Sequence, residues 1–403
     1  MLATDRTLTL KNVLLATGVI LTLAMGVRHG FGFWLQPISQ ANGWTRETYS
    51  LAQAMQNLMW GAFGPFAGMA ADRFGTMRVV LVGALCYAAG LVWMAMVTQP
   101  TLFVLGTGVL VGLGLACTAF GAVSGIIGRV APPEKRSWAF GVSGAASSFG
   151  QFMMMPIEQQ LISAVGWQNA FYILGALILL LMVPMALYLR EPAVQHAHGP
   201  QQSVREAASE ALGNRSFLFL VAGYFVCGFQ VVFIGVHLPA YLKDQGIVNP
   251  NVAVLALALI GLFNIFGSYY AGKLGGRFPK RYLLSTIYFS RSVVISLFLL
   301  APLMPLSVYL FAAAMGVLWL STVPLTNGII AGVFGVKHMS MLAGIVFFSH
   351  QLGSFLGVWL GGYLYTNTGS YDIVWGIAIA LGVMSGLINL PINERPLART
   401  QAA

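Results

Sequence analysis

Arg28 is the residue whose type and position first suggest a chemistry. It lies near the middle of a long apolar segment, where burying an arginine in a membrane costs about 2.5–3.5 kcal/mol. No carboxylate occurs in the surrounding stretch GVRHGFGFW, and Glu158 is the one acidic residue that we expect inside an apolar segment. A guanidinium without a counter-ion can hold an anion through two parallel hydrogen bonds. We therefore expect Arg28 to bind an anion; the alternative is a structural bond to Glu158 or to helix-end carbonyls.

Other kinds of reactive site find little support in the sequence. Cys86, Cys117 and Cys227 each stand alone in an apolar stretch, so neither a disulfide framework nor a metal site of the Cys-x-x-Cys type is expected. The stretch 141-144, GVSG, fits the G-x-S-G pattern of serine hydrolases, with His350 as the base. So short a pattern arises readily by chance. We therefore expect no enzyme activity, no catalytic residue, no metal and no cofactor.

The composition indicates a helical membrane protein that holds these residues in place. Of 403 residues, 58% are hydrophobic and only 8% are charged, which is not the balance of a water-soluble domain. The apolar segments reach about 20 residues, the length of a spanning helix, whereas a spanning strand needs only about 10. The pattern predicts an all-α membrane protein with twelve transmembrane helices, at 12-38, 47-71, 79-98, 101-129, 138-162, 167-189, 216-242, 251-272, 282-301, 305-332, 339-365 and 371-391.

One long polar stretch divides the twelve spans into two sets of six. The predicted units are an N-terminal six-helix bundle over 1-189, a cytoplasmic linker over 190-215, and a C-terminal six-helix bundle over 216-403. Within the linker, the residues VREAASEAL have the composition of a short helix.

The basic residues predict which way the chain crosses the membrane. Of 21 Lys and Arg residues, 17 fall in the segments on the side of both termini, two fall on the other side and two lie inside spans. Cytoplasmic loops carry the excess of basic residues, so both termini are expected in the cytoplasm. The formal charge of +10 is spread along the chain, so we expect no nucleic-acid partner. A multi-pass monomer in the lipid bilayer of a cell membrane, such as a bacterial inner membrane, follows.

The two halves of the chain resemble each other. The stretch GMAADRF after the second span recurs as GKLGGRF after the eighth, and the GVR that contains Arg28 aligns with the GFQ that contains Gln230. Parallel repeats of six helices are typical of two bundles related by an axis along the membrane normal, with a cavity between them near the midplane. Proteins built in this way move solutes.

The loop after the second span identifies the family. The stretch 68-78, GMAADRFGTMR, resembles the signature G-x-x-x-D-R-x-G-x-x-R of the major facilitator superfamily, and the twelve spans and the degenerate second copy agree with it. Within the superfamily, KRSWAFG with the later Gly144 and Gly150 resembles the monocarboxylate porter and oxalate/formate antiporter branch. The resemblance implies a gating role for charged residues at the span ends, namely Asp72, Arg73, Arg78 and Arg277.

The resemblance also implies which spans face the cavity. In this superfamily they are spans 1, 4, 7 and 10, with 2, 5, 8 and 11 beside them. The expected substrate-binding residues are therefore Arg28, His29, Gln230, Asn327, His350 and Gln351. His350 is the predicted proton carrier, because imidazole changes charge near neutral pH. If His350 is only a packing residue, His29 or Glu158 becomes the carrier, or the protein is a pure anion exchanger. Whether Arg291, in an outer helix, reaches the cavity is left open.

The expected function is secondary active transport of a small organic anion, a mono- or dicarboxylate, by proton symport or anion exchange. The alternative is a proton-coupled efflux pump for drugs or other small molecules. Such pumps for cationic drugs generally have an acidic residue in the cavity, which the spans lack apart from Glu158. A sensor built on the same fold is a further alternative, and absence of flux would distinguish it.

Overall fold

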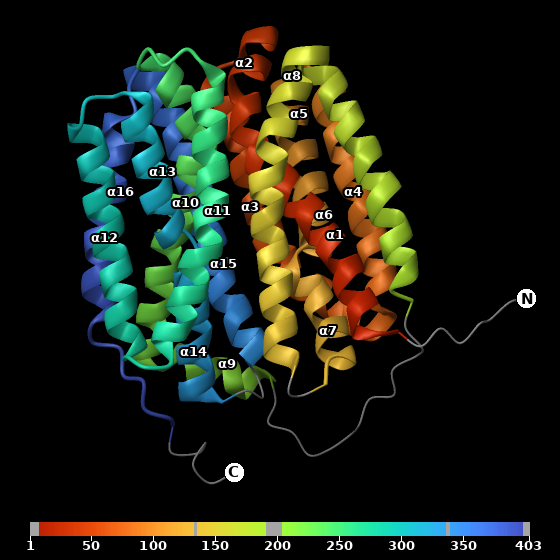
Figure 1. Cartoon of the computed structure of the whole chain (residues 1–403), viewed down its shortest axis with the longest axis vertical. Coiled ribbons are helices and arrows are strands. Elements are labelled where there is room, and N and C mark those ends of the chain that lie inside the picture. Colours follow the sequence, from red (N-terminus) through yellow and green to blue (C-terminus); the bar gives the residue numbers. More distant parts are fainter. Residues whose placement is uncertain (1–7, 133–134, 191–203, 336–338, 398–403) are drawn as a thin grey trace, which may run out of the picture.

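The structure, a computed structural model, describes residues 8–132, 135–190, 204–335 and 339–397, and every regular element in these ranges is helical (Figure 1). The first helix begins and the last helix ends at the bottom of Figure 1, whereas the loop from α2 to α3 lies at the top. We call these the terminal end and the far end of the molecule.

The first half contains several helices that change character partway. The first predicted span is divided into three elements and the fourth into four, whereas the fifth and sixth run on as one element with non-helical backbone at Gly166. The elements are α1 (Leu10–His29), η1 (Gly30–Trp34), α2 (Leu35–Asn42), α3 (Arg46–Phe74), α4 (Thr76–Met96), α5 (Pro100–Gly106), η2 (Thr107–Val111), α6 (Gly112–Thr118), α7 (Phe120–Val130) and α8 (Arg136–Tyr188).

The second half repeats this order after a short linker helix, which confirms the helix expected in VREAASEAL. Its tenth predicted span is broken into α13 and α14. The elements are α9 (Val204–Leu212), α10 (Arg215–Asp244), α11 (Pro250–Gly275), α12 (Lys280–Leu300), α13 (Pro305–Leu318), α14 (Thr322–Phe334), α15 (Met339–Thr368) and α16 (Asp372–Asn389).

Within the described ranges, ten helical segments are long and apolar enough to cross a membrane. The other two predicted spans, 47-71 and 138-162, are also helical, as α3 and the first limb of α8. They are less apolar because they carry buried polar groups, among them Gln53, Asn57, Gln151 and Glu158. The structure thus shows an all-helical membrane bundle, while the count of twelve crossings and the sidedness of the termini remain predictions.

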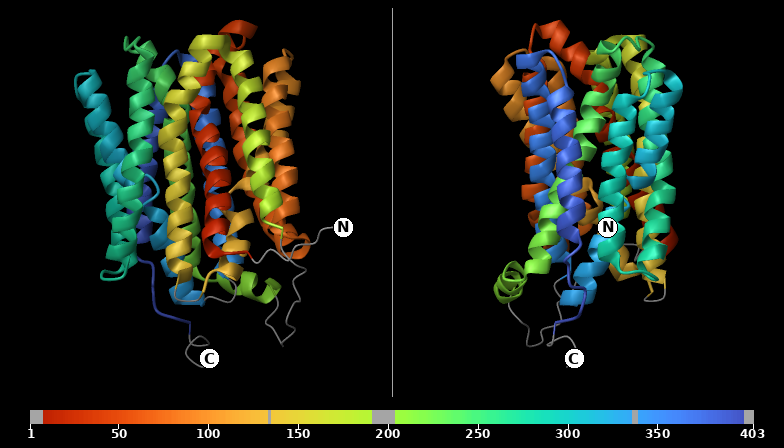
Figure 2. Two further views of the ribbon diagram at one scale, coloured as in Figure 1. Left: turned by 45° about the vertical axis from the view of Figure 1, so that its right-hand side comes forward. Right: turned by 90° about the vertical axis from the view of Figure 1, so that its left-hand side faces the viewer.

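The helices gather in two groups around a central seam. Elements α1–α8 lie on one side in Figure 1 and α10–α16 on the other, and the turned views in Figure 2 show all the long helices running roughly along one direction. Across the seam α3 packs against α15 and the first limb of α8 against α11, while η1 packs against α10. Residues far apart in the sequence therefore meet at this seam.

Glycines allow the closest helix contacts. A Cβ atom on Gly353 of α15 would lie 1.9 Å from the carbonyl oxygen of Phe225 in α10, and one on Gly357 would lie 2.4 Å from that of Phe229. Small residues spaced four apart let two membrane helices approach to backbone contact. The sequence pattern at Gly353 and Gly357 therefore serves packing within the second group of helices.

We expect Gly353→Ala to destabilise the protein by about 1–3 kcal/mol, because the added methyl group overlaps the α10 backbone and neither helix can move without unpacking. Gly141→Ala is the matched control, since a Cβ there would have nothing within 4 Å. Thermal unfolding of the purified variants in detergent, followed by tryptophan fluorescence, measures the difference. Equal stability of the two variants would contradict this account of the α10–α15 contact.

Candidate functional site

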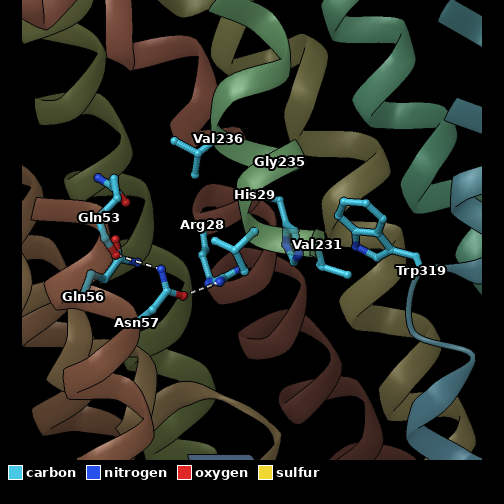
Figure 3. A pocket seen from close by; sticks show the side chains of 10 residues that line it. Arg28, His29, Gln53, Gln56, Asn57, Val231, Gly235, Val236 and Trp319 are labelled. Carbon is cyan, nitrogen blue, oxygen red and sulfur yellow. Dashed lines mark hydrogen bonds between the residues drawn. The ribbon is translucent and has the colours of Figure 1, made fainter. Parts of the chain in front are cut away.

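A small pocket lies on the seam between the two groups of helices, and Arg28 reaches into it (Figure 3). Its free space is about 20 Å³, enough for a water molecule and too little for an organic solute. A larger ligand would need the two groups to separate. The lining residues are Arg28, His29, Gln53, Gln56, Asn57, Val231, Val232, Gly235, Val236 and Trp319.

Arg28 stands in the last turn of α1, where the partial negative charge of the helix end favours a cation. Its Nη2 donates to Oδ1 of Asn57 at 2.6 Å, and its guanidinium lies 4.8 Å from the centre of the Trp60 ring. Its Nε is buried and has no hydrogen-bond partner among the described residues. The structure thus brings Arg28 to the pocket, holds it on α3, and leaves part of its hydrogen-bonding capacity unused.

Further buried polar atoms around Arg28 also lack partners in the described ranges. They are the donors Gln53 Nε2 and Trp319 Nε1 and the acceptor Gln56 Oε1. No carboxylate is among the residues that line the pocket. An unpaired buried polar group costs about 1–3 kcal/mol. The two unpaired donors, together with the arginine, suit a negatively charged ligand with several acceptor atoms.

The opposite wall of the pocket is apolar. It consists of Val231, Val232 and Val236 on α10. Close contact with η1 is possible because Gly32 has no side chain: a Cβ there would lie 2.5 Å from the carbonyl oxygen of Gly235. The pocket therefore has a polar side on α1 and α3 and an apolar side on α10, a division that suits a ligand with one charged end.

The structure places the two central histidines differently. His29 lines the pocket, and its Nδ1 lies 2.6 Å from the carbonyl oxygen of Met25. His350 is 7% exposed and packs among aromatic rings of α10 and α15, with its Nδ1 3.3 Å from Gln351 Oε1 and 3.4 Å from Ser354 Oγ. His350 is thus held inside the second group of helices and does not line the pocket.

Gln351 lies on the seam, whereas α14, which carries Asn327, packs against helices of its own group. Gln351 is fully buried, and it faces α3, where a Cβ on Gly61 would lie 2.6 Å from its Cβ; its Nε2 has no partner among the described residues. Gly61 is one turn from Asn57, so Gln351 is one turn away from the partner of Arg28. Asn327 is half-buried on α14 and does not line the pocket.

Gln230 does not reach the pocket, although the repeat aligns it with Arg28. It is fully buried, donates from Nε2 to the carbonyl oxygen of Ala378 at 2.8 Å, and accepts from Arg291 Nη1 at 3.4 Å. The two halves are similar in sequence only coarsely, and in the second half the cation comes from α12. Gln230 therefore connects α10 to α12 and α16.

Arg291 holds the break between α13 and α14. Its Nη2 donates to the carbonyl oxygens of Leu318 and Trp319 at 2.7 and 2.5 Å, and its Nε donates to that of Leu318 at 3.2 Å. These carbonyls are the unpaired acceptors that a helix leaves at its C-terminus. Arg291 thus stays outside the pocket and fixes the segment that carries Trp319 into it.

The four predicted gating residues lie at helix ends. Arg73, Arg78 and Arg277 are exposed, and the side chain of Asp72 lies outside the described residues. Gly75, with φ +88°, joins α3 to α4 directly, a backbone conformation that favours glycine. In the second half, Glu394 Oε1 accepts from the backbone N–H of Arg281 at 2.7 Å, and Lys280 Nζ lies 3.8 Å from Glu394 Oε2.

An ion pair that the sequence analysis missed joins the two groups at the far end. Arg46, at the start of α3, donates from Nη1 and Nη2 to the two carboxylate oxygens of Asp244, at the end of α10, at 2.5 and 2.7 Å. Both side chains are mostly buried, with 14% and 24% exposure. The sequence contained one indication of this pair: Arg46 and Lys243 are the two basic residues predicted on the side of the membrane opposite the termini. We call this pair the far-end latch.

Two tyrosines support the latch. The guanidinium of Arg46 lies 3.7 Å from the centre of the Tyr365 ring, and its Nη1 donates to the Tyr371 hydroxyl at 3.0 Å. That hydroxyl can in turn donate to Nδ1 of His237, 3.2 Å away, since the other ring nitrogen of His237 faces the carbonyl oxygen of Val358. The far end is thus closed by a bidentate pair with neighbours from α10, from α15 and from the residue that precedes α16.

The arrangement of Ser143 and His350 does not suit serine catalysis. The Ser143 hydroxyl donates to the carbonyl oxygen of Ala139 at 3.0 Å in the first limb of α8, and His350 is bonded within α15. A nucleophile and its base must lie within hydrogen-bond reach of each other, and these two residues have other partners on different groups of helices.

Comparison with known proteins gives a consistent result. Residues 15–330 match the family model described as Major Facilitator Superfamily. The chain is 26% identical to the uncharacterized MFS-type transporter YcxA of Bacillus subtilis, over 96% of each chain. It is 27% identical to monocarboxylate transporter 4 of Rattus norvegicus, over 85% of this chain and 74% of that one. It is also 26% identical to the probable sulfoacetate transporter SauU of Cupriavidus necator, over 88% and 89%.

Solved structures agree in fold. A bacterial homolog of the human lysosomal transporter Spinster, in an inward-facing and unoccupied conformation, superposes with a TM-score of 0.76 at 15% sequence identity, over 94% of this chain and 96% of that one. An occupied form of the same protein gives the same TM-score.

Proposed function

The chain belongs to the major facilitator superfamily, a family of transporters and not of enzymes, and from this premise we propose that it carries a small organic anion by alternating access. Its relatives include monocarboxylate transporters, so the branch expected from the sequence is confirmed. The proposed substrate is a monocarboxylate or dicarboxylate, moved by proton symport or by exchange against another anion.

The observation that carries the proposal is the charge of the pocket. Arg28 offers a guanidinium with an unpaired Nε, and Gln53 and Trp319 add unpaired donors. The lining residues include no carboxylate to neutralise them. A carboxylate ligand would accept from these groups together, at a site where charge-assisted hydrogen bonds are stronger than in water. The wall of valines favours an anion whose other end is short and apolar.

The names of two relatives support this choice. One is a monocarboxylate transporter and another a probable sulfoacetate transporter, and both names refer to small organic acids. A cationic drug would meet an arginine without a carboxylate partner in the pocket, which supports an anion over a cationic drug as the substrate.

Alternating access follows from the two groups of helices. We propose that they are the bundles 1-189 and 216-403, each with six crossings, and that both termini face the cytoplasm. Rocking about the seam would open the pocket first to one side and then to the other. The charged residues at the terminal end, Asp72, Arg73, Arg78 and Arg277, are the proposed gate on that side, and the far-end latch is its counterpart.

Asp72→Asn should slow exchange of substrate between the two sides and leave substrate binding intact, because the proposed role of Asp72 is in gating. Calorimetric titration with lactate measures binding, and exchange of labelled lactate in proteoliposomes measures flux. Loss of binding in a correctly folded variant would place Asp72 in a different role.

Counterflow in proteoliposomes tests the function itself. Vesicles loaded with unlabelled lactate, propionate, succinate or sulfoacetate should take up labelled acid of the same kind, for at least one of the four. Protein-free vesicles and vesicles with Arg28→Gln protein are the controls. Flux of a cationic dye without flux of any acid would favour the efflux alternative, and binding without flux would favour a sensor.

A further inference from the structure

Glu158 is a buried carboxyl group that the proposed anion site does not use. It lies on the first limb of α8 and is 0% exposed. The indole Nε1 of Trp34 donates to its Oε2 at 3.1 Å, whereas Oε1 is buried without a hydrogen-bond partner among the described residues. An ionised carboxylate left partly unpaired away from water is costly, so this group needs either a proton or a cation.

Glu158 is packed against the end of the helix that carries Arg28. A Cβ atom on Gly30 would lie 1.8 Å from Glu158 Oε2 and 2.7 Å from Oε1. Only glycine leaves room here, at the point where α1 passes into η1. Arg28 and His29, the two residues before Gly30, both line the pocket. The carboxyl group therefore lies against the chain within two residues of both of these pocket residues.

The titratable groups around Glu158 come from three helices. Tyr49 on α3 and Tyr87 on α4 interact electrostatically with Glu158, and Tyr87 also interacts with Arg28 on α1. His29 is the residue next to Gly30 along the chain. The hydroxyls of Tyr49 and Tyr87 donate to the carbonyl oxygens of Phe31 and Ala24 at 2.6 and 3.1 Å. Their protons are thus already engaged, and Arg28, two residues before Gly30, is the one member of this set that carries a permanent positive charge.

We propose that Glu158 is the proton-binding site of the transporter and that its carboxylate competes with the transported anion for the positive charge of Arg28. The inference rests on the proposed function and specifies its coupling. The proton binds Oε1, because Oε2 already accepts from Trp34. With the proton in place Glu158 is neutral, and Arg28 is free to bind the substrate anion. When the proton leaves, the negative charge of Glu158 offsets that of Arg28 and the anion is released.

The linkage works in both directions. If protonation of Glu158 strengthens binding of the anion, the bound anion must strengthen binding of the proton by the same factor. One proton then moves with each anion. Affinity for the anion is high at low pH and falls as pH rises, by about tenfold for each pH unit over the range in which the carboxyl loses its proton.

The first test uses Glu158→Gln, which has nearly the same shape as the protonated acid. Lactate affinity of this variant should be as high as that of the wild type at low pH and should stay constant as pH rises. Exchange of labelled lactate should continue, whereas accumulation driven by a pH gradient should be lost. Glu158→Asp, which retains a carboxyl group, should restore a pH dependence, and Glu206→Gln, on the exposed face of α9, is the matched control.

The second test observes the proton directly and does not need a substrate. Infrared difference spectra of the purified protein between low and high pH should show the band of a protonated carboxyl that is absent in Glu158→Gln and present in Glu206→Gln. Identical spectra of the two variants, or a wild-type pH dependence of lactate affinity in Glu158→Gln, would overturn the proposal. Loss of pH dependence in His350→Gln alone would assign the proton to His350 instead. If the wild type transports no acid, the function fails, and the spectra still decide the role of Glu158.

Discussion

Arg28→Lys should weaken binding of the transported anion by about 10–150-fold, the loss expected when one or more charge-assisted hydrogen bonds worth 1.5–3 kcal/mol are removed. Lysine keeps the charge but has neither the planar fork nor an equivalent of Nε. With one hydrogen bond to Asn57, its ammonium cannot also offer a carboxylate the two parallel hydrogen bonds for which the guanidinium has donors to spare (Figure 3). Calorimetric titration of purified protein with lactate and succinate measures the effect.

The controls separate ligand binding from folding. Arg78→Lys makes the same chemical change at an exposed position and should leave affinity unaltered. Asn57→Ala removes the side chain that positions Arg28 and should cause a smaller loss than Arg28→Lys. Unchanged affinity in a folded Arg28→Lys variant would show that the guanidinium only ties α1 to α3, and the anion site would have to be sought elsewhere.

Asp244→Arg should open the far end of the transporter. The variant replaces a bidentate ion pair with two like charges held at the same place, between α3 and α10. Because the pair is partly exposed, water screens some of the interaction, and we expect the ratio of open to closed molecules to change by about tenfold or more, which corresponds to about 1.4 kcal/mol. Nitroxide labels are attached at positions 45 and 245 in a background without Cys86. Double electron–electron resonance then measures the distance between the two labels.

Reversal of the pair provides the decisive control. Arg46→Asp combined with Asp244→Arg should restore much of the closed population, although the contacts of Arg46 with Tyr365 and Tyr371 are lost. Lys243→Gln changes the charge of the exposed neighbouring residue and should leave the distance distribution as it is. If Asp244→Arg gives the wild-type distribution, the pair does not hold the far end closed, and the apolar contacts of η1 with α10 must do so.

The small size of the pocket links anion binding at Arg28 to opening of the far end. The free space beside Arg28 holds a water molecule, not a carboxylate of several carbon atoms. Binding and opening are therefore coupled, because the two groups of helices must move apart before Arg28 can take up its ligand. A variant that weakens the far-end latch should accordingly admit substrate faster from that side, and faster lactate exchange in Asp244→Asn vesicles would be the sign of it.

Much of the protein follows from its sequence. The length and spacing of the apolar segments predicted the helices, because about 20 helical residues are needed to cross the hydrocarbon layer. The stretch 68-78 predicted the family, and Arg28 stood out because an arginine in an apolar segment requires a polar partner. These inferences depend on composition and on position along one helix, and both can be read without knowing how the helices pack.

Tertiary structure decided which side chains meet. The repeat aligned Gln230 with Arg28 and predicted it as a substrate-binding residue, yet the structure joins it to Arg291 and Ala378. The sequence did not predict that Arg46 pairs with Asp244, 198 residues apart, or that Glu158 lies against Gly30. Successive side chains point about 100° apart around a helix. If a helix packs with its register shifted by one or two residues, a side chain that faced the cavity becomes buried between helices. The hydrophobic pattern tolerates such changes, because nearly every face of these helices is apolar. Close packing at glycines such as Gly32 and Gly353, together with polar contacts such as that of Arg28 with Asn57, fixes the rotation.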